Sequence, residues 1–89
     1  MIKRAFIIVQ GRVQGVGFRY FVNRAAINYD IKGYVKNLPN GDVEIDAEGE
    51  EYKLNLFINE CKKGPSYANI VHCHITFPAP AHYLNFTIK

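Results

Sequence analysis

Hydrophobic residues recur with two different periods along this chain, and the changes of period outline its secondary structure. Residues Ile2–Val9 are rich in β-branched side chains and nearly continuous in hydrophobicity, which predicts a strand inside a sheet. Residues 43–48 alternate apolar and polar side chains, which predicts a half-exposed strand. Three further strands are expected at Gly33–Lys36, Asn69–Phe77 and Tyr83–Ile88.

Two segments instead show the period of an amphipathic helix. In Phe18–Tyr29 the apolar residues recur at helical spacing and would form one buried stripe. In a second helix the apolar residues follow the pattern i, i+3, i+4, i+7. They are Leu54, Phe57, Ile58 and Cys61. The pair Gly64–Pro65 then ends this helix, with glycine just past its last turn and proline beyond.

The order of these elements predicts the fold class. Residues 38–41 read Leu-Pro-Asn-Gly, a turn that would join the strands on either side into a hairpin. The chain then runs β-α-β-β-α-β with an additional C-terminal fifth strand, the ferredoxin-like α/β sandwich of the α+β class. Right-handed crossovers place both helices on one face of an antiparallel sheet.

Length and composition indicate the number of domains, the kinds of partner and the cellular location of this protein. With 89 residues and 48% hydrophobic content, we expect a single globular domain over residues 1–89. The net charge of +3 favours small anions but does not by itself indicate nucleic acid. No apolar run approaches the ~20 residues of a membrane span, and the one after Met1–Arg4 is shorter than a secretory signal needs. We therefore expect a cytoplasmic protein with no membrane or nucleic-acid partner.

The candidate chemistry lies in the sequence GRVQGVGFR, residues 11–19. Three glycines between a strand and a helix allow backbone N–H groups to converge on one point, as an anion cradle requires. Arg19 would add a planar, permanently charged fork that suits phosphate oxygens. A cation in the first helical turn opposes the helix dipole, and a bound dianion would remove that conflict. The plain alternative is a glycine-rich connection without a ligand.

The same stretch excludes two common phosphate-binding motifs. It has no Gly-Lys-Ser/Thr ending and is therefore not a Walker A loop. A dinucleotide fingerprint would need a third glycine at position 20, where the chain has Tyr20.

Three stretches of the sequence together closely resemble the acylphosphatase family. They are GRVQGVGFR at 11–19, GYVKNLPNGDVE at 33–44 and GPSYANIV at 64–71. The resemblance covers essentially the whole chain, in order and with family-like spacing. Departures from the common pattern include Tyr34, Lys36 and Asn40, none of which is a catalytic residue of the family. Asp30 stands where a glycine often ends the first helix, and aspartate tolerates a left-handed backbone less well.

The resemblance implies an enzyme and assigns its site. The family hydrolyses the carboxyl–phosphate bond of acyl phosphates to a carboxylate and inorganic phosphate, with no metal and no cofactor. The phosphate-binding loop would be Gln14, Gly15, Val16, Gly17 and Phe18. Arg19 would hold the phosphate oxygens and Asn37 would position the attacking water. We expect a monomer that acts on a small-molecule acyl phosphate.

Three alternatives remain beside this hypothesis. A non-catalytic member would bind phosphate or another anion without turnover. An RNA-binding module is suggested faintly by the aromatic residues in Gly17–Val22, although these enter a predicted helix and not a strand. A metal site is suggested by His72, His74 and nearby His82, for which a solvent-facing pair is the plainer interpretation.

The two cysteines, Cys61 and Cys73, are expected to be small, reduced core residues and not a disulfide.

Overall fold

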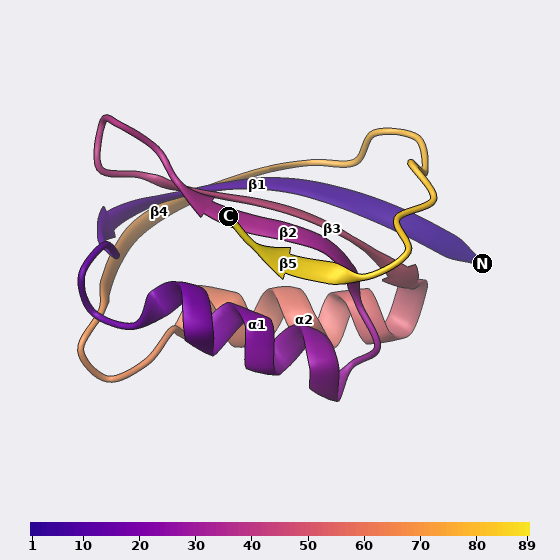
Figure 1. The fold of residues 1–89 in the computed structure, drawn as a ribbon, viewed down its shortest axis with the longest axis horizontal. Helices are drawn as coiled ribbons and strands as arrows, with labels where there is room; N and C mark the ends of the chain where they lie inside the picture. The colour runs from indigo at the N-terminus through magenta and orange to yellow at the C-terminus, as the bar shows by residue number, and fades with distance from the viewer.

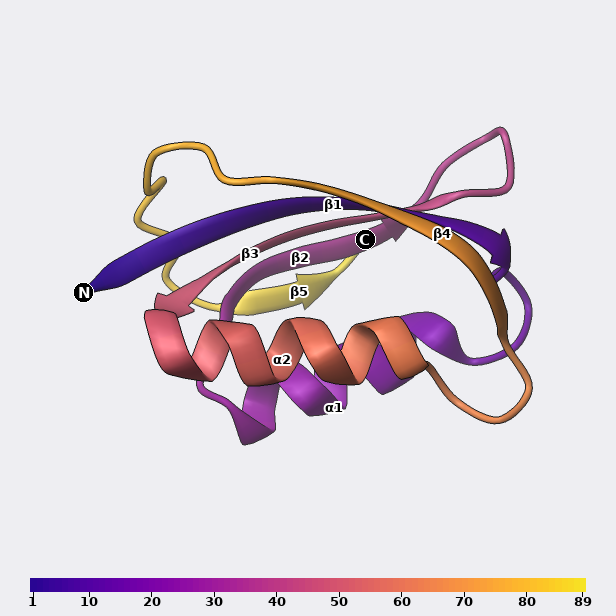
Figure 2. The same ribbon diagram turned by 180° about the vertical axis from the view of Figure 1, so that it is seen from behind.

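The computed structural model describes all 89 residues, and its helices and strands follow the predicted order. The strands are β1 (Ile2–Arg12), β2 (Lys32–Asn37), β3 (Val43–Glu50), β4 (Asn69–Thr76) and β5 (Phe86–Ile88). The helices are α1 (Phe18–Asn28) and α2 (Glu51–Lys63). Both helices cover the same face of one five-stranded sheet with the order β4-β1-β3-β2-β5 (Figures 1 and 2). The ferredoxin-like α+β fold is therefore confirmed.

The sheet is mixed, and not wholly antiparallel as predicted. β1 pairs antiparallel with β3 and β4, and β2 with β3, but β5 lies parallel to β2. After β4 the chain crosses to the opposite edge of the sheet at the end where β2 begins (Figure 1). It then returns along β2 and must run in the same direction. The residues before Phe86 belong to this crossing segment, so β5 is shorter than the predicted Tyr83–Ile88.

One stripe of each helix and alternate strand residues form the core. The four positions predicted for α2 are all buried, with exposed fractions between 0% and 6%. In α1, Phe18 and Val22 are buried, and Phe21 and the C-cap residue Tyr29 pack against the core from its edge. The inward residues of β1 are Ala5, Ile7 and Val9. The periods in the sequence thus identified the buried faces correctly.

The polar face of β3 is the exception, because the crossing segment 77–85 covers part of it. Asp46 is only 2% exposed, although its place in an alternating pattern predicts a half-exposed face. Arg4 Nε and Nη2 donate to its carboxylate at 2.8 and 2.6 Å, and the Tyr83 hydroxyl donates at 2.8 Å. These three donors compensate the cost of burying a charge.

Glu48 is buried beside Asp46 and is held in its charged form by the same segment. The N–H groups of Ala81 and Tyr83 each donate to its carboxylate at 2.7 Å. Burial by itself raises the pKa of Glu48, but these N–H groups outweigh it and lower the pKa below the ordinary value of 4.5. The stability that the carboxylate contributes is therefore complete above about pH 4.5 and is lost as pH falls through its folded pKa.

We expect Glu48→Gln to lower the free energy of unfolding at neutral pH and to flatten its decline in acid. The amide cannot accept both N–H groups as a carboxylate does, and it does not titrate. Urea unfolding at a series of pH values measures both effects. An acid decline as steep in the variant as in the wild type would contradict this role of Glu48.

Helix α1 ends in a left-handed residue that is not glycine. Asp30 has φ 55°, just after the C-cap Tyr29. The N–H of Asp30 donates to the carbonyl of Ile27 at 3.3 Å, and that of Ile31 to the carbonyl of Ala26 at 2.8 Å. This is the hydrogen-bond pattern of a Schellman motif, whose left-handed residue is usually glycine. Asp30 therefore adopts the left-handed conformation that aspartate tolerates less well than glycine.

We expect Asp30→Gly to raise the free energy of unfolding by up to ~1 kcal/mol. Glycine removes a left-handed strain of roughly 1–2 kcal/mol, offset in part by the greater freedom of the unfolded chain. The exposed ion pair between Asp30 and Lys32, at 3.0 Å, is also lost, and such pairs contribute little. Chemical denaturation measures the change. Asp30→Asn serves as control, because it removes the charge and keeps a side chain; lower stability in the glycine variant than in this control would contradict the prediction.

Candidate active site

Residues 13–17 form the loop that joins β1 to α1. Both glycines of this loop adopt a left-handed backbone conformation, which residues with a side chain disfavour. Gly15 has φ 74° and Gly17 φ 78°. A Cβ at either position would meet no atom within 4 Å, so the left-handed backbone, and not crowding, is what requires glycine. Left-handed residues of this kind occur in backbone loops whose N–H groups bind anions.

The first turn of α1 adds backbone donors next to this loop. Gly17 is the N-cap, and no side chain caps the helix. The first helical hydrogen bond runs from the N–H of Phe21 to the carbonyl of Gly17 at 3.0 Å. The N–H groups of Phe18, Arg19 and Tyr20 therefore have no helical carbonyl to bind. Together with the positive end of the helix dipole, they favour a bound anion.

Gly11, the first glycine of the 11–19 motif, is required by strand pairing and not by the loop. Gly11 and Arg12 belong to the end of β1, and a Cβ on Gly11 would lie 2.1 Å from the carbonyl oxygen of Asn69. The pairing of β1 with β4 shifts register between Gln10 and Gly11. This glycine allows the two strands to approach at the shift, so the glycine-rich loop is shorter than the sequence suggested.

Arg19 lies in the first turn of α1 and is tied to the neighbourhood of β2. Its Nη1 donates to the backbone oxygen of Lys89 at 2.8 Å. The N–H of Lys89 in turn donates to the carbonyl of Val35, within β2, at 2.8 Å. The guanidinium makes no other hydrogen bond within the protein, so its remaining donors are free for a ligand.

Asn37, the last residue of β2, carries an unsatisfied polar atom. Its Oδ1 is the one buried side-chain nitrogen or oxygen in the protein with no hydrogen-bond partner. Buried polar groups in native proteins are almost always satisfied, so an orphan of this kind indicates a place for water or a ligand.

The side chain of Gln14 brings the loop and Asn37 together. Its Nε2 donates to the carbonyl of Leu38 at 2.7 Å and to that of Asp42 at 2.9 Å. Leu38 directly follows Asn37, so the start of the loop is bound to the turn that begins beside Asn37. Sequence reasoning missed this contact and the one between Arg19 and Lys89. Both join residues far apart in the chain, and no local pattern signals them.

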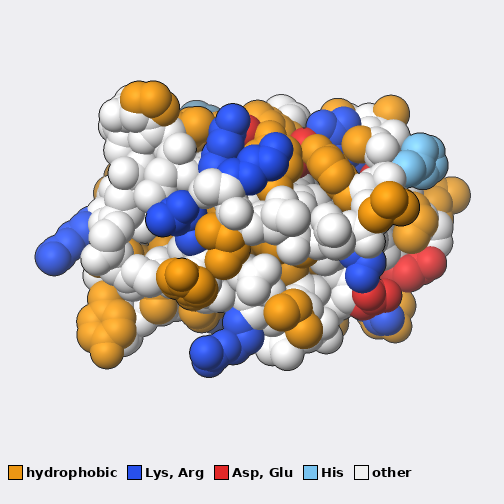
Figure 3. Space-filling model, in the orientation of Figure 1, with side chains coloured by type: hydrophobic (Ala, Val, Ile, Leu, Met, Phe, Trp, Pro, Cys, Tyr) orange, Lys and Arg blue, Asp and Glu red, His pale blue; other side chains and the backbone are white.

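The charge distribution suits an anionic ligand at this end of the molecule. Lys and Arg side chains occupy most of the charged surface on the side where the loop and the end of β2 lie, and the acidic residues in view lie mainly toward the other end (Figure 3). Such a field attracts anions and raises their rate of encounter.

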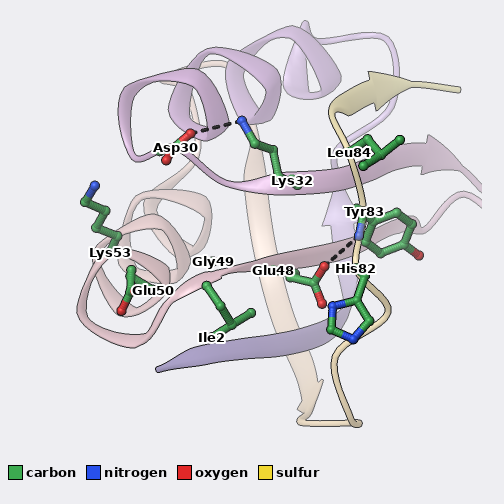
Figure 4. Close-up of a pocket in the computed structure, with 10 residues that line it drawn as sticks. All are labelled: Ile2, Asp30, Lys32, Glu48, Gly49, Glu50, Lys53, His82, Tyr83 and Leu84. Carbon is green, nitrogen blue, oxygen red and sulfur yellow. Dashed lines mark hydrogen bonds and ion pairs between the residues drawn. The ribbon is translucent and has the colours of Figure 1, made fainter.

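The two surface pockets lie away from this loop. Each has a volume of about 400 Å³, and neither includes residues 14–19 or Asn37. The pocket in Figure 4 lies between Ile2, Lys32, Glu48 and His82, and Asp30 and Lys32 in it are paired with each other at 3.0 Å. A phosphoryl group is small and is bound by surface N–H donors, so its site does not require a deep cavity.

The structure also shows the aromatic residues that suggested RNA binding and the histidines that suggested a metal site. Phe18 and Phe21 stack on each other with ring centroids 6.3 Å apart on α1, so they form no aromatic platform on a strand. His72 and His74 lie side by side on β4, with centroids 4.2 Å apart. No group of three or more His, Cys, Asp or Glu residues comes together as a metal site.

Both cysteines are free. Burial raises the pKa of both Cys61 and Cys73, which keeps the thiols protonated. No helix has the length and apolar character needed to cross a membrane.

Comparisons with known proteins bear on the family and the fold of this chain. The profile of the acylphosphatase family matches residues 5–88. An acylphosphatase of Thermotoga maritima is 47% identical over 88 residues, covering 99% of this chain and 98% of that protein. One of Archaeoglobus fulgidus is 56% identical over 64 residues, covering 72% of each. The crystal structure of acylphosphatase from Bacillus subtilis superposes with a TM-score of 0.95 at 40% identity, covering 100% of this chain and 99% of that one.

Proposed function

This chain belongs to the acylphosphatase family and is a hydrolase of acyl phosphates, and we propose that the 14–19 loop binds the phosphoryl group while Asn37 orients the attacking water. The loop residues are Gln14, Gly15, Val16, Gly17 and Phe18, which would contribute backbone N–H groups. Arg19 would contribute its guanidinium. The observation that carries the proposal is the buried, unpartnered Oδ1 of Asn37, next to the residue that Gln14 binds from the loop, together with the unpaired donors at the start of α1.

The chemistry of the substrate matches this set of groups. In phosphoryl transfer the transition state is loose, and its charge is spread over three equatorial oxygens. Several N–H donors and one guanidinium fork can hold these oxygens at once, so that positioning and charge stabilisation replace covalent catalysis.

The attacking water needs an acceptor that fixes its direction. The Oδ1 of Asn37 has a free lone pair for one O–H of that water, and the amide NH₂ can donate to a phosphoryl oxygen. A water held in this way would lie close to phosphorus before the reaction begins.

The proton balance requires no acid or base from the protein. An acyl phosphate dianion and water give a carboxylate and dihydrogen phosphate, so both protons of the water remain with the phosphate product. The leaving carboxylate is stable without a proton. This accounts for a loop that carries neither histidine nor a carboxylate.

We further propose that the enzyme acts as a cytoplasmic monomer formed by one domain, without a metal, cofactor, membrane or nucleic-acid partner. The backbone donors and Arg19 supply the positive field for which other phosphoryl-transfer enzymes use Mg²⁺. The modest net charge of +3 supports a small anionic substrate over a polyanion.

Hydrolysis of benzoyl phosphate by the pure protein in EDTA tests the proposal. We expect turnover that is unchanged by the chelator and is lost in Arg19→Ala. Turnover that disappears in EDTA and returns with Mg²⁺ would contradict the metal-free site. Full turnover in Arg19→Ala would remove Arg19 from the site.

A further inference from the structure

Gln14 has a side chain whose contacts are not explained by phosphate binding. An amide NH₂ carries two hydrogens, and those of Gln14 are directed to two backbone carbonyls, of Leu38 at 2.7 Å and Asp42 at 2.9 Å. With both hydrogens engaged, this nitrogen has no donor left for a phosphoryl oxygen. The backbone N–H of Gln14 is proposed to bind phosphate, so the side chain must have a different role.

The two carbonyls that it binds are those that close the hairpin turn. The Leu38 carbonyl also accepts the N–H of Gly41 at 3.1 Å, and the Asp42 carbonyl accepts the N–H of Leu38 at 2.8 Å. Gln14 thus adds a second hydrogen bond to each end of the turn and joins the turn to the phosphate loop. The contact is partly buried, where such hydrogen bonds are less exposed to competition by water.

Asn37 depends on this turn for its position. Its Oδ1 has no protein partner, so no hydrogen bond to that atom fixes it relative to the loop. The hydrogen bond from Gln14 to the carbonyl of Leu38 ties residues 14–19 to the residue next to Asn37. A shift of the turn away from the loop would carry Asn37 with it, and a misplacement of about 1 Å can cost roughly 10²-fold in rate.

We propose that the side chain of Gln14 is a positioning residue that holds Asn37, and the water bound to it, in line with the phosphoryl group. This inference rests on the proposed role of Asn37. It predicts that loss of the Gln14 amide lowers kcat without a matching loss of phosphate affinity.

The test combines Gln14→Met with Asn37→Ala in a double-mutant cycle. Methionine has similar length and no donor. We expect Gln14→Met alone to lower kcat by at least about tenfold, with inhibition by inorganic phosphate changed by less than about threefold. In the Asn37→Ala background the same substitution should have no further effect on kcat, because it acts through Asn37.

Two controls separate this role from loss of structure. Asn40→Ala removes hydrogen bonds to Asp42 within the same turn, at 3.0 and 3.2 Å, without touching Gln14, and should leave kcat near the wild-type value. Gln14→Leu likewise has no donor for the two carbonyls and adds no charge near the phosphate loop, so it should resemble Gln14→Met. This second variant replaces Gln14→Met in the cycle if the methionine variant does not fold. Circular dichroism at the assay temperature would reveal that.

The outcomes distinguish this inference from the proposed function. An equal effect of Gln14→Met in both backgrounds, or a loss of phosphate inhibition in parallel with kcat, would overturn the positioning role while the role of Asn37 stands. Unchanged kcat in Gln14→Met would overturn it also. If Asn37→Ala itself retained full kcat, the proposed function of Asn37 would fail first.

Discussion

Replacing Arg19 by lysine is expected to abolish activity almost as fully as replacing it by alanine. We expect Arg19→Ala to lower kcat/KM by about 10³-fold or more, the order found when an arginine is removed from a phosphoryl-transfer site. Lysine keeps the charge but presents it as a point on a flexible stem, whereas the guanidinium is planar and can hold two oxygens together.

The structure gives a second reason for this expectation. Arg19 Nη1 donates to the backbone oxygen of Lys89 at 2.8 Å, so one end of the guanidinium is already held before a substrate arrives. A lysine ammonium bound to that oxygen would have two N–H donors left for the phosphoryl group, where the guanidinium has four. We therefore expect Arg19→Lys to lie within about tenfold of Arg19→Ala in kcat/KM.

Steady-state hydrolysis of benzoyl phosphate measures both variants. Arg24→Ala is the matched control, because it removes an exposed arginine from the same helix outside its first turn. It should alter kcat/KM by only a few fold, through the long-range field. Near-normal turnover in Arg19→Lys would mean that charge alone is sufficient at this position.

Asn37→Ala is expected to separate activity from stability. We expect kcat to fall by roughly 10²-fold or more, as when one positioned group is removed from an active site. Inhibition by inorganic phosphate should change much less, because the loop and Arg19 remain. A collapse of phosphate affinity with kcat preserved would make Asn37 a binding residue instead.

The free energy of unfolding provides an independent readout for the same variant. Since the Oδ1 of Asn37 is buried without a partner, its removal costs no protein hydrogen bond and relieves an unsatisfied group. Asn37→Ala should therefore be at least as stable as the wild type in urea. A large destabilisation would mean that Asn37 serves the fold, and that its loss of activity is indirect.

Several parts of this protein could be predicted because their causes are local. The spacing of Leu54, Phe57, Ile58 and Cys61 identified the buried stripe of α2, and all four are buried. Helix and strand periods depend on residues a few positions apart, so the sequence alone contains them. The same applies to the hairpin turn at 38–41. The resemblance of three motifs to acylphosphatases identified the family.

Other features depended on contacts between distant residues and were decided only by the tertiary structure. The alternation in β3 correctly separated its two faces, but Asp46 and Glu48 are buried because segment 77–85 crosses that face. The direction of β5 follows from the same crossing. Neither result can be read from local periodicity, since each depends on where a later part of the chain packs.

The candidate site shows the same division. The sequence by itself determined the family, the glycine-rich loop before a helix and the residue types that suit a phosphoryl group. Only the tertiary structure decided that Gln14 reaches residues 24 and 28 positions away, and that Arg19 is held by Lys89, 70 positions away. The physical reason is that backbone preferences act over a few residues, whereas a hydrogen bond between distant side chain and backbone exists only once packing has brought them together.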